Sequence, residues 1–110
     1  MAVIEYSQLL KVSLGDEAFA KEIVQRFLRD ASVYKHVLDR GLRNKDFIEI
    51  KKVLQQLKSS AQVFGAVTLV ENIRKVEMAD LTKYDQYEGL VKSTYSLLQD
   101  LEKEAAGLPL

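Results

Sequence analysis

The sequence predicts an all-α fold, an antiparallel four-helix bundle with an additional short N-terminal helix. Apolar residues recur with a helical period of 3.6, and long alternating runs typical of strands are missing. The only proline is Pro109, so nothing earlier forces a helix to break. With 110 residues, of which 47% are hydrophobic and 29% charged, the chain is expected to form one domain over residues 1–110.

Five helices are expected, with boundaries set by capping residues and glycines. They cover roughly residues 3–11, 16–42, 46–64, 66–80 and 84–104. Polar residues suited to N-terminal caps precede three of them: Asp16 followed by Glu17, Asp46 with Glu49 three residues later, and Thr82 with Asp85. Gly65 separates two helices, and we expect it to take a positive φ in a tight turn.

Each long helix carries an apolar stripe that is expected to face the core. Its members are three or four residues apart, which places them on one side of a helix. They are Ala20, Ile23, Val24, Phe27, Ala31, Tyr34 and Leu38; Ile50, Val53, Leu57, Ala61 and Phe64, with Leu54 at the edge; Val70, Ile73 and Val76; and Tyr87, Val91, Thr94, Leu98 and Leu101.

The amino-acid composition argues against several classes of function. The chain has no cysteine, which excludes thiol catalysis, disulfides and thiolate metal sites. The formal net charge is zero, so nothing indicates a nucleic-acid partner. His36 is the only histidine, and we expect it on the outer face of its helix without a companion metal ligand. We therefore expect a protein that is not an enzyme and has no cofactor or metal site.

The hydropathy of the sequence leads to an expectation about where in the cell the protein is found. No apolar stretch is long enough to span a membrane, and the N-terminus lacks a signal-peptide pattern. We expect a monomer that is cytoplasmic (also nuclear if eukaryotic) and has no membrane partner. Met1 and the short length favour a free-standing chain, although a domain cut from a longer protein would share these features.

The third expected helix, residues 46–64, has an unusual polar face. At about 100° per residue, six polar residues fall within about 60° of Gln55, opposite the apolar stripe. They are Lys51, Lys52, Gln55 itself, Lys58, Ser59 and Gln62. The three lysines give this face a local positive charge that the neutral total conceals. Periodicity alone predicts that this face is exposed to solvent.

Residues 55–66, with the sequence QQLKSSAQVFGA, resemble the central motif of histidine-containing phosphotransfer (HPt) domains. That motif runs His-x-hydrophobic-Lys-Gly-Ser-Ser-x-x-hydrophobic-Gly-Ala. The Gly15-Asp16 opening and residues 27–31 of the long helix also fit the family. The resemblance implies a protein of two-component signalling, in which an exposed histidine exchanges a phosphoryl group with the receiver domain of a response regulator. It also implies that Lys58 offsets phosphoryl charge.

Two of the departures from the motif, at positions 55 and 59, decide the chemistry. Gln55 occupies the position of the phosphoacceptor histidine, and Ser59 occupies that of a glycine which gives the receiver room to approach. A carboxamide nitrogen is delocalised into its carbonyl and cannot replace the nucleophilic imidazole nitrogen. Ser59 either obstructs close approach or adds a hydrogen bond, and the sequence leaves both open.

The resulting hypothesis is a pseudo-HPt protein of a phosphorelay. The resemblance implies that the polar face around Gln55 docks the receiver domain of a response regulator or hybrid histidine kinase. The protein would thereby modulate or compete with phosphotransfer.

Two alternatives stay open. The chain could be an engineered His-to-Gln form of an active HPt protein. It could also be a non-signalling scaffold or self-associating bundle, with an exposed apolar strip on the first helix. The strip would contain Val3, Ile4, Leu9, Leu10 and Val12.

Overall fold

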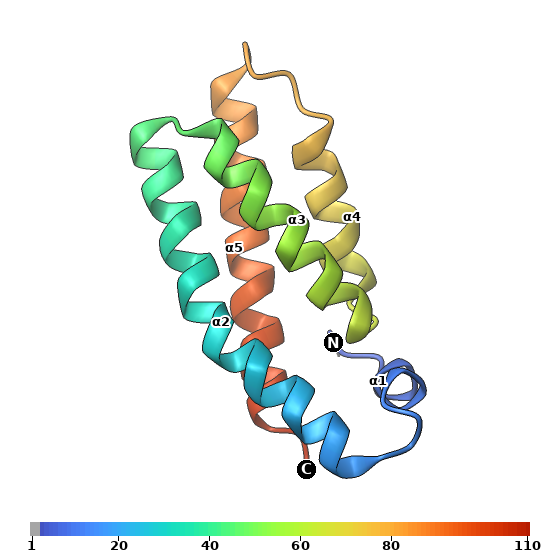
Figure 1. The fold of residues 1–110 in the computed structure, drawn as a ribbon. Helices are drawn as coiled ribbons and strands as arrows, with labels where there is room; N and C mark the ends of the chain where they lie inside the picture. Colours follow the sequence, from blue (N-terminus) through green and yellow to red (C-terminus); the bar gives the residue numbers. More distant parts are fainter. Residues whose placement is uncertain (1–2) are drawn as a thin grey trace.

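The computed structural model of the protein describes residues 3–110, and this part of the chain is all-helical (Figure 1). The helices are α1 (Tyr6–Val12), α2 (Glu17–Asn44), α3 (Phe47–Val63), α4 (Val67–Glu77) and α5 (Tyr84–Ala106). The predicted all-α class is confirmed, and the long helices begin within a few residues of the expected positions. None of the helices in residues 3–110 combines the length and apolar character that a membrane crossing requires.

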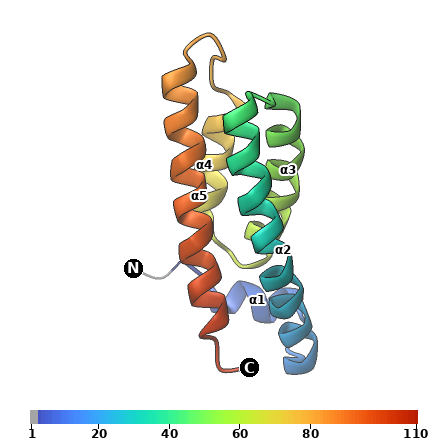
Figure 2. The ribbon, with the colours of Figure 1, turned by 90° about the vertical axis from the view of Figure 1, so that its left-hand side faces the viewer.

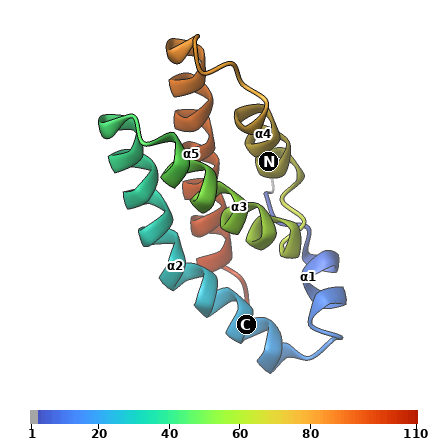
Figure 3. The ribbon, with the colours of Figure 1, turned by 45° about the horizontal axis from the view of Figure 1, so that its top comes forward.

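The four longer helices make a closed ring of contacts, in which α2 packs on α3, α3 on α4, α4 on α5 and α5 on α2. Figure 2 shows α5 and α2 side by side along the long axis of the molecule. The short helix α1 contacts α2 and α3 and lies across one end of the bundle, near the end of α3 (Figure 3). The molecule is therefore elongated, with extents of 45 × 21 × 21 Å.

Side-chain caps start two of the helices as predicted. Asp16 Oδ1 accepts hydrogen bonds from the backbone N–H groups of Ala18 and Phe19, at 2.9 and 3.2 Å. Asp46 Oδ1 accepts from the Glu49 N–H at 3.1 Å. Each bond satisfies a backbone donor that the first turn of a helix leaves unpaired.

The predicted cap of α5 is wrong. Its N-cap residue is Lys83, and no side chain bonds to the first turn. Thr82 bonds instead to a residue that precedes it: its N–H and its hydroxyl both donate to Asp80 Oδ1, at 2.9 and 2.6 Å. A threonine and an aspartate two residues before it form a local turn of their own, which competes with capping.

The core contains the predicted stripes. Every residue of the four stripes is buried except Ile23, which is half-buried, and Leu54 is also buried rather than at the edge. Phe27 and Phe64 meet edge to face, with ring centroids 5.1 Å apart. Thr94 is fully buried, and its hydroxyl accepts a hydrogen bond from Asn72 Nδ2 at 2.6 Å, which joins α4 to α5.

Four of the five residues of the apolar strip expected on the first helix are buried or half-buried. Ile4 and Leu9 are buried, Val3 and Leu10 are half-buried, and only Val12 is exposed. The strip that a self-associating bundle was expected to expose is therefore not present on this segment.

Candidate docking face

Gln55 is exposed near the middle of α3, as its position opposite the apolar stripe predicts. We call the six predicted residues around it the Gln55 face: Lys51, Lys52, Gln55, Lys58, Ser59 and Gln62. Five of them are exposed, and Lys58 is half-buried. The buried Val53, Leu54 and Leu57 hold the opposite side of α3 in the core, so the orientation of the face is fixed by packing.

The charge on this face is smaller than the sequence indicates. Lys58 Nζ lies 2.8 and 3.1 Å from the two carboxylate oxygens of Glu77 on α4. Lys51 and Lys52 are exposed, and neither takes part in an ion pair within residues 3–110. Of the three lysines on this face, Lys58 is thus neutralised by Glu77. Lys51 and Lys52 are the two whose charge no ion pair in residues 3–110 compensates.

Ser59 uses its hydroxyl within its own helix. Its Oγ donates to the backbone carbonyl of Gln55, one turn earlier, at 3.3 Å. This bond lies within α3 and does not decide between the two roles toward a partner that the sequence left open. The residue is still exposed and adds bulk where a glycine would add none.

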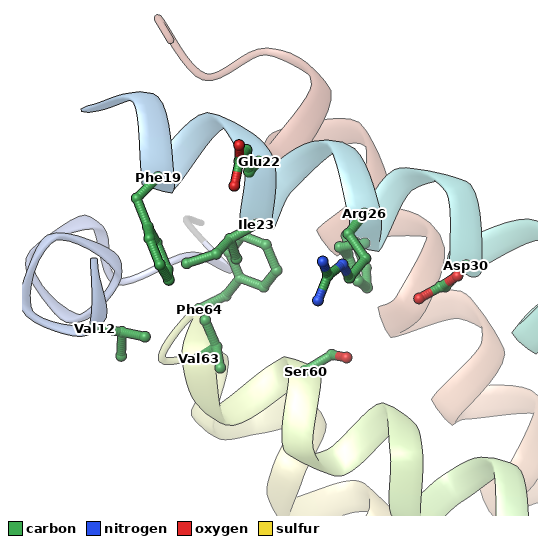
Figure 4. Close-up of a pocket in the computed structure, with 10 residues that line it drawn as sticks. Val12, Phe19, Glu22, Ile23, Arg26, Asp30, Ser60, Val63 and Phe64 are labelled. Atoms are coloured by element: carbon green, nitrogen blue, oxygen red, sulfur yellow. The ribbon is translucent and has the colours of Figure 1, made fainter. Parts of the chain in front are cut away.

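A groove that the sequence did not predict lies beside this face, between α1, α2 and α3, and both apolar and charged side chains line it (Figure 4). Its volume is about 400 Å³, and its apolar lining includes Val12, Phe19, Ile23, Val63 and Phe64. Phe19 is 49% exposed and Val12 is 38% exposed, so two large side chains leave apolar surface open to solvent here. Figure 4 also shows the Arg26 side chain reaching from α2 toward Ser60 on α3.

The groove and the Gln55 face adjoin on α3. Val63 lies one turn after Ser59 and about 80° around the helix axis from Gln55. The sequence contained one signal for the groove, because Phe19 falls beside the inward stripe of α2 and has no place in the core. Its partner Val12 could not be assigned, since the position of α1 depends on the tertiary fold.

The remaining titratable groups lie away from the Gln55 face or on other helices. His36 is exposed on α2, as expected. In the described chain, residues 3–110, no three His, Cys, Asp or Glu side chains are placed to hold a metal. Shifted pKa values occur on the α4–α5 connection and on α5: hydrogen bonds from Thr82 lower the pKa of Asp80, and burial raises the pKa of Tyr84 and Tyr87.

Comparisons of the chain with protein-family models, with curated proteins and with solved structures find no match. Function must therefore be argued from the site.

Proposed function

We propose that this protein docks receiver domains of response regulators or hybrid histidine kinases through the Gln55 face, and that it accepts no phosphoryl group. The observation that carries the proposal is the exposed Gln55 at the centre of a face whose motif resembles that of HPt domains. The exposure of this face supports docking, and the side chain at its centre has no nucleophilic nitrogen.

The mechanism is competition. Receiver domains carry an acidic phosphorylation pocket, which Lys51 and Lys52 attract, and the adjoining groove offers apolar surface to the same partner. Docking occupies the receiver surface that a competent HPt protein needs, which dampens or redirects the phosphorelay. An interface of this kind is expected to be transient and to bury about 1,200 Å² or less in total.

The fold proposed with this function is an antiparallel four-helix bundle with a short N-terminal helix across one end. The closed ring of contacts among α2, α3, α4 and α5 supports it, as do the short connections between α2, α3 and α4. In such a bundle α3 keeps one side in the core and the other in solvent along its whole length, as docking requires.

The scaffold alternative has less support, since Ile4 and Leu9 of its expected contact strip are buried. The engineered alternative has the same fold and the same Gln55 face. It differs only in whether the glutamine at position 55 is natural or was introduced in place of a histidine.

The proposal is tested by titrating the purified protein with isolated receiver domains of its source organism, using calorimetry. We expect dissociation constants of tens of micromolar. The double variant Lys51→Glu/Lys52→Glu should weaken binding about tenfold or more, because it reverses both uncompensated charges, and this loss should shrink as salt rises.

Lys103→Glu is the control, since Lys103 is exposed near the end of α5 and does not belong to the Gln55 face, whose six residues all lie on α3. It should bind like the parent protein. Absence of binding to every receiver domain at these concentrations, or equal weakening by the control, would overturn the proposal.

A further inference from the structure

The ion pair between Lys58 and Glu77 differs from the pairs formed within a single helix. It joins α3 to α4 across 19 residues of sequence, and the side chains are only 27% and 23% exposed. In the pair Arg43–Asp39, both from α2, the corresponding values are 66% and 62%. Lys58 also contacts both carboxylate oxygens of Glu77, at 2.8 and 3.1 Å. A partly desolvated pair with two short contacts is screened less by solvent than an exposed pair.

This pair changes what an incoming anion meets near Gln55. Lys58 is three residues after Gln55, one helical turn along the same face. A phosphoryl group brought to Gln55 would be attracted by the ammonium of Lys58 and repelled by the carboxylate of Glu77. Because the two charges are 2.8 Å apart, the attraction and the repulsion nearly cancel.

Uncompensated positive charge therefore lies on the other side of Gln55. Lys51 and Lys52 precede Gln55 by four and three residues, one turn toward the start of α3, and both are exposed. They can bind the acidic rim of a partner whether or not that partner is phosphorylated.

We propose that Glu77 masks Lys58, so that the Gln55 face binds phosphorylated and unphosphorylated receivers equally well. This inference rests on the proposed function for its biological meaning, whereas the masking itself can be tested without a receiver. A competitor of this kind blocks a receiver throughout the phosphorylation cycle, rather than only before or after transfer.

The first experiment measures receiver dissociation constants with and without fluoroberyllate, which mimics the phosphoryl group on the receiver aspartate. The parent protein should bind both forms within about twofold. Glu77→Gln should prefer the fluoroberyllate form by about twofold to fivefold, the range expected for releasing one partly exposed cation. Glu71→Gln is the control, since it removes the same charge from an exposed residue of α4 that forms no ion pair in residues 3–110.

The second experiment uses phosphoramidate as a small phosphodonor and needs no receiver. In the Gln55→His variant, the P–N bond of phosphoramidate breaks and phosphorus bonds to an imidazole nitrogen. The ring proton is released, and ammonia leaves. Adding Glu77→Gln should raise the initial rate about twofold to fivefold, whereas adding Glu71→Gln should not. The gain should disappear when Lys58→Gln is also present. Thermal melting monitored by circular dichroism verifies that each variant is folded.

The two experiments separate the two claims. If no receiver binds, the proposed function fails, and the phosphoramidate rates still decide whether Glu77 masks Lys58. If receivers bind but the parent protein already prefers the fluoroberyllate form, the inference fails while the proposed function stands. If Gln55→His reacts with phosphoramidate equally fast when combined with Glu77→Gln or with Glu71→Gln, Glu77 does not mask Lys58, whether or not receivers bind.

Discussion

Gln55, Lys58 and Ser59 each set one chemical property of the Gln55 face. The Gln55 carboxamide donates and accepts hydrogen bonds but offers no nucleophile. Lys58 is neutralised by Glu77, and the Ser59 hydroxyl is bonded to the Gln55 carbonyl. Position 55 therefore offers no nucleophile, the lysine beside it is neutralised, and both features suit the proposed docking without transfer.

A prediction at the residue scale concerns Asp80 and Thr82. Hydrogen bonds from the Thr82 hydroxyl and, to a lesser extent, its N–H favour the ionised carboxylate and lower the pKa of Asp80 below 3.8. A lowered folded-state pKa stabilises the protein above the unfolded-state pKa, and this contribution is lost as the pH falls through the folded-state value. Thr82→Val should raise the pKa of Asp80 and move acid unfolding to a higher pH.

The carboxyl chemical shift of Asp80, followed by NMR against pH, measures this change directly. Thr68→Val is a suitable control, because Thr68 is exposed on α4 and forms no hydrogen bond to a carboxylate within residues 3–110. An unchanged Asp80 titration in Thr82→Val would contradict the assignment of the cause.

At the scale of elements, α1 is the helix that depends most on its neighbours. It has seven residues, too few to be stable alone in water. The preceding segment is held by Glu104 of α5, whose carboxylate accepts from the N–H groups of Val3 and Ile4 at 2.6 and 3.0 Å. The Glu5 N–H donates to the Phe64 carbonyl at 2.8 Å, which fixes α1 against the end of α3. One wall of the groove therefore depends on these contacts.

Removing the Glu104 carboxylate should release this segment. We expect Glu104→Ala to cost about 1–3 kcal/mol of unfolding free energy, since it leaves two backbone donors without their acceptor. Amide hydrogen exchange should accelerate in residues 3–12 and much less in α3. Lys103→Ala, the neighbouring exposed position, should do neither. Unchanged exchange in residues 3–12 would show that the tether is unimportant.

Replacing glycine by alanine should have opposite effects on stability at two positions, Gly65 in the turn between α3 and α4 and Gly89 inside α5. Gly65 has a φ of +64°, and a Cβ there would lie 2.5 Å from Glu5 Cβ, so Gly65→Ala should destabilise the protein by more than about 1 kcal/mol. Gly89 lies inside α5, and a Cβ added to it would meet nothing within 4 Å, so Gly89→Ala should stabilise by about 0.4–1 kcal/mol. Urea unfolding measures both, and the same sign for both variants would refute this explanation of the turn.

At the scale of the whole molecule, the sequence predicted what short-range chemistry controls. The caps Asp16 and Asp46, the positive φ of Gly65 and the inward stripes all depend on residues within a turn or two. The cap predicted for α5 failed because Thr82 had two acidic neighbours within reach, and spacing alone could not show that Asp80 would be bonded instead of Asp85.

The features that were missed join distant parts of the chain. The Lys58–Glu77 pair requires the register of α3 against α4, and the groove requires the position of α1 against α2 and α3. Periodicity assigns a residue to a face but does not say which residue of another helix stands opposite. The position of Gln55 was therefore predictable, whereas the charge around it was not.

If the protein docks receivers as proposed, the whole molecule serves as a rigid support for one face of α3. The central claim is that the Gln55 face docks a receiver and that phosphotransfer fails because position 55 has no nucleophile. Restoring an imidazole should then restore transfer, which can be measured with a receiver domain carrying a radiolabelled phosphoryl group. Gln56→His is the matched control, since Gln56 is also exposed but lies about 100° further around α3.

We predict that label moves from the receiver to the Gln55→His variant in a bond that is stable to alkali and labile to acid. The parent protein and the Gln56→His variant should remain unlabelled under the same conditions. Absence of label on a folded Gln55→His variant that binds the receiver, or equal label on Gln56→His, would contradict the claim.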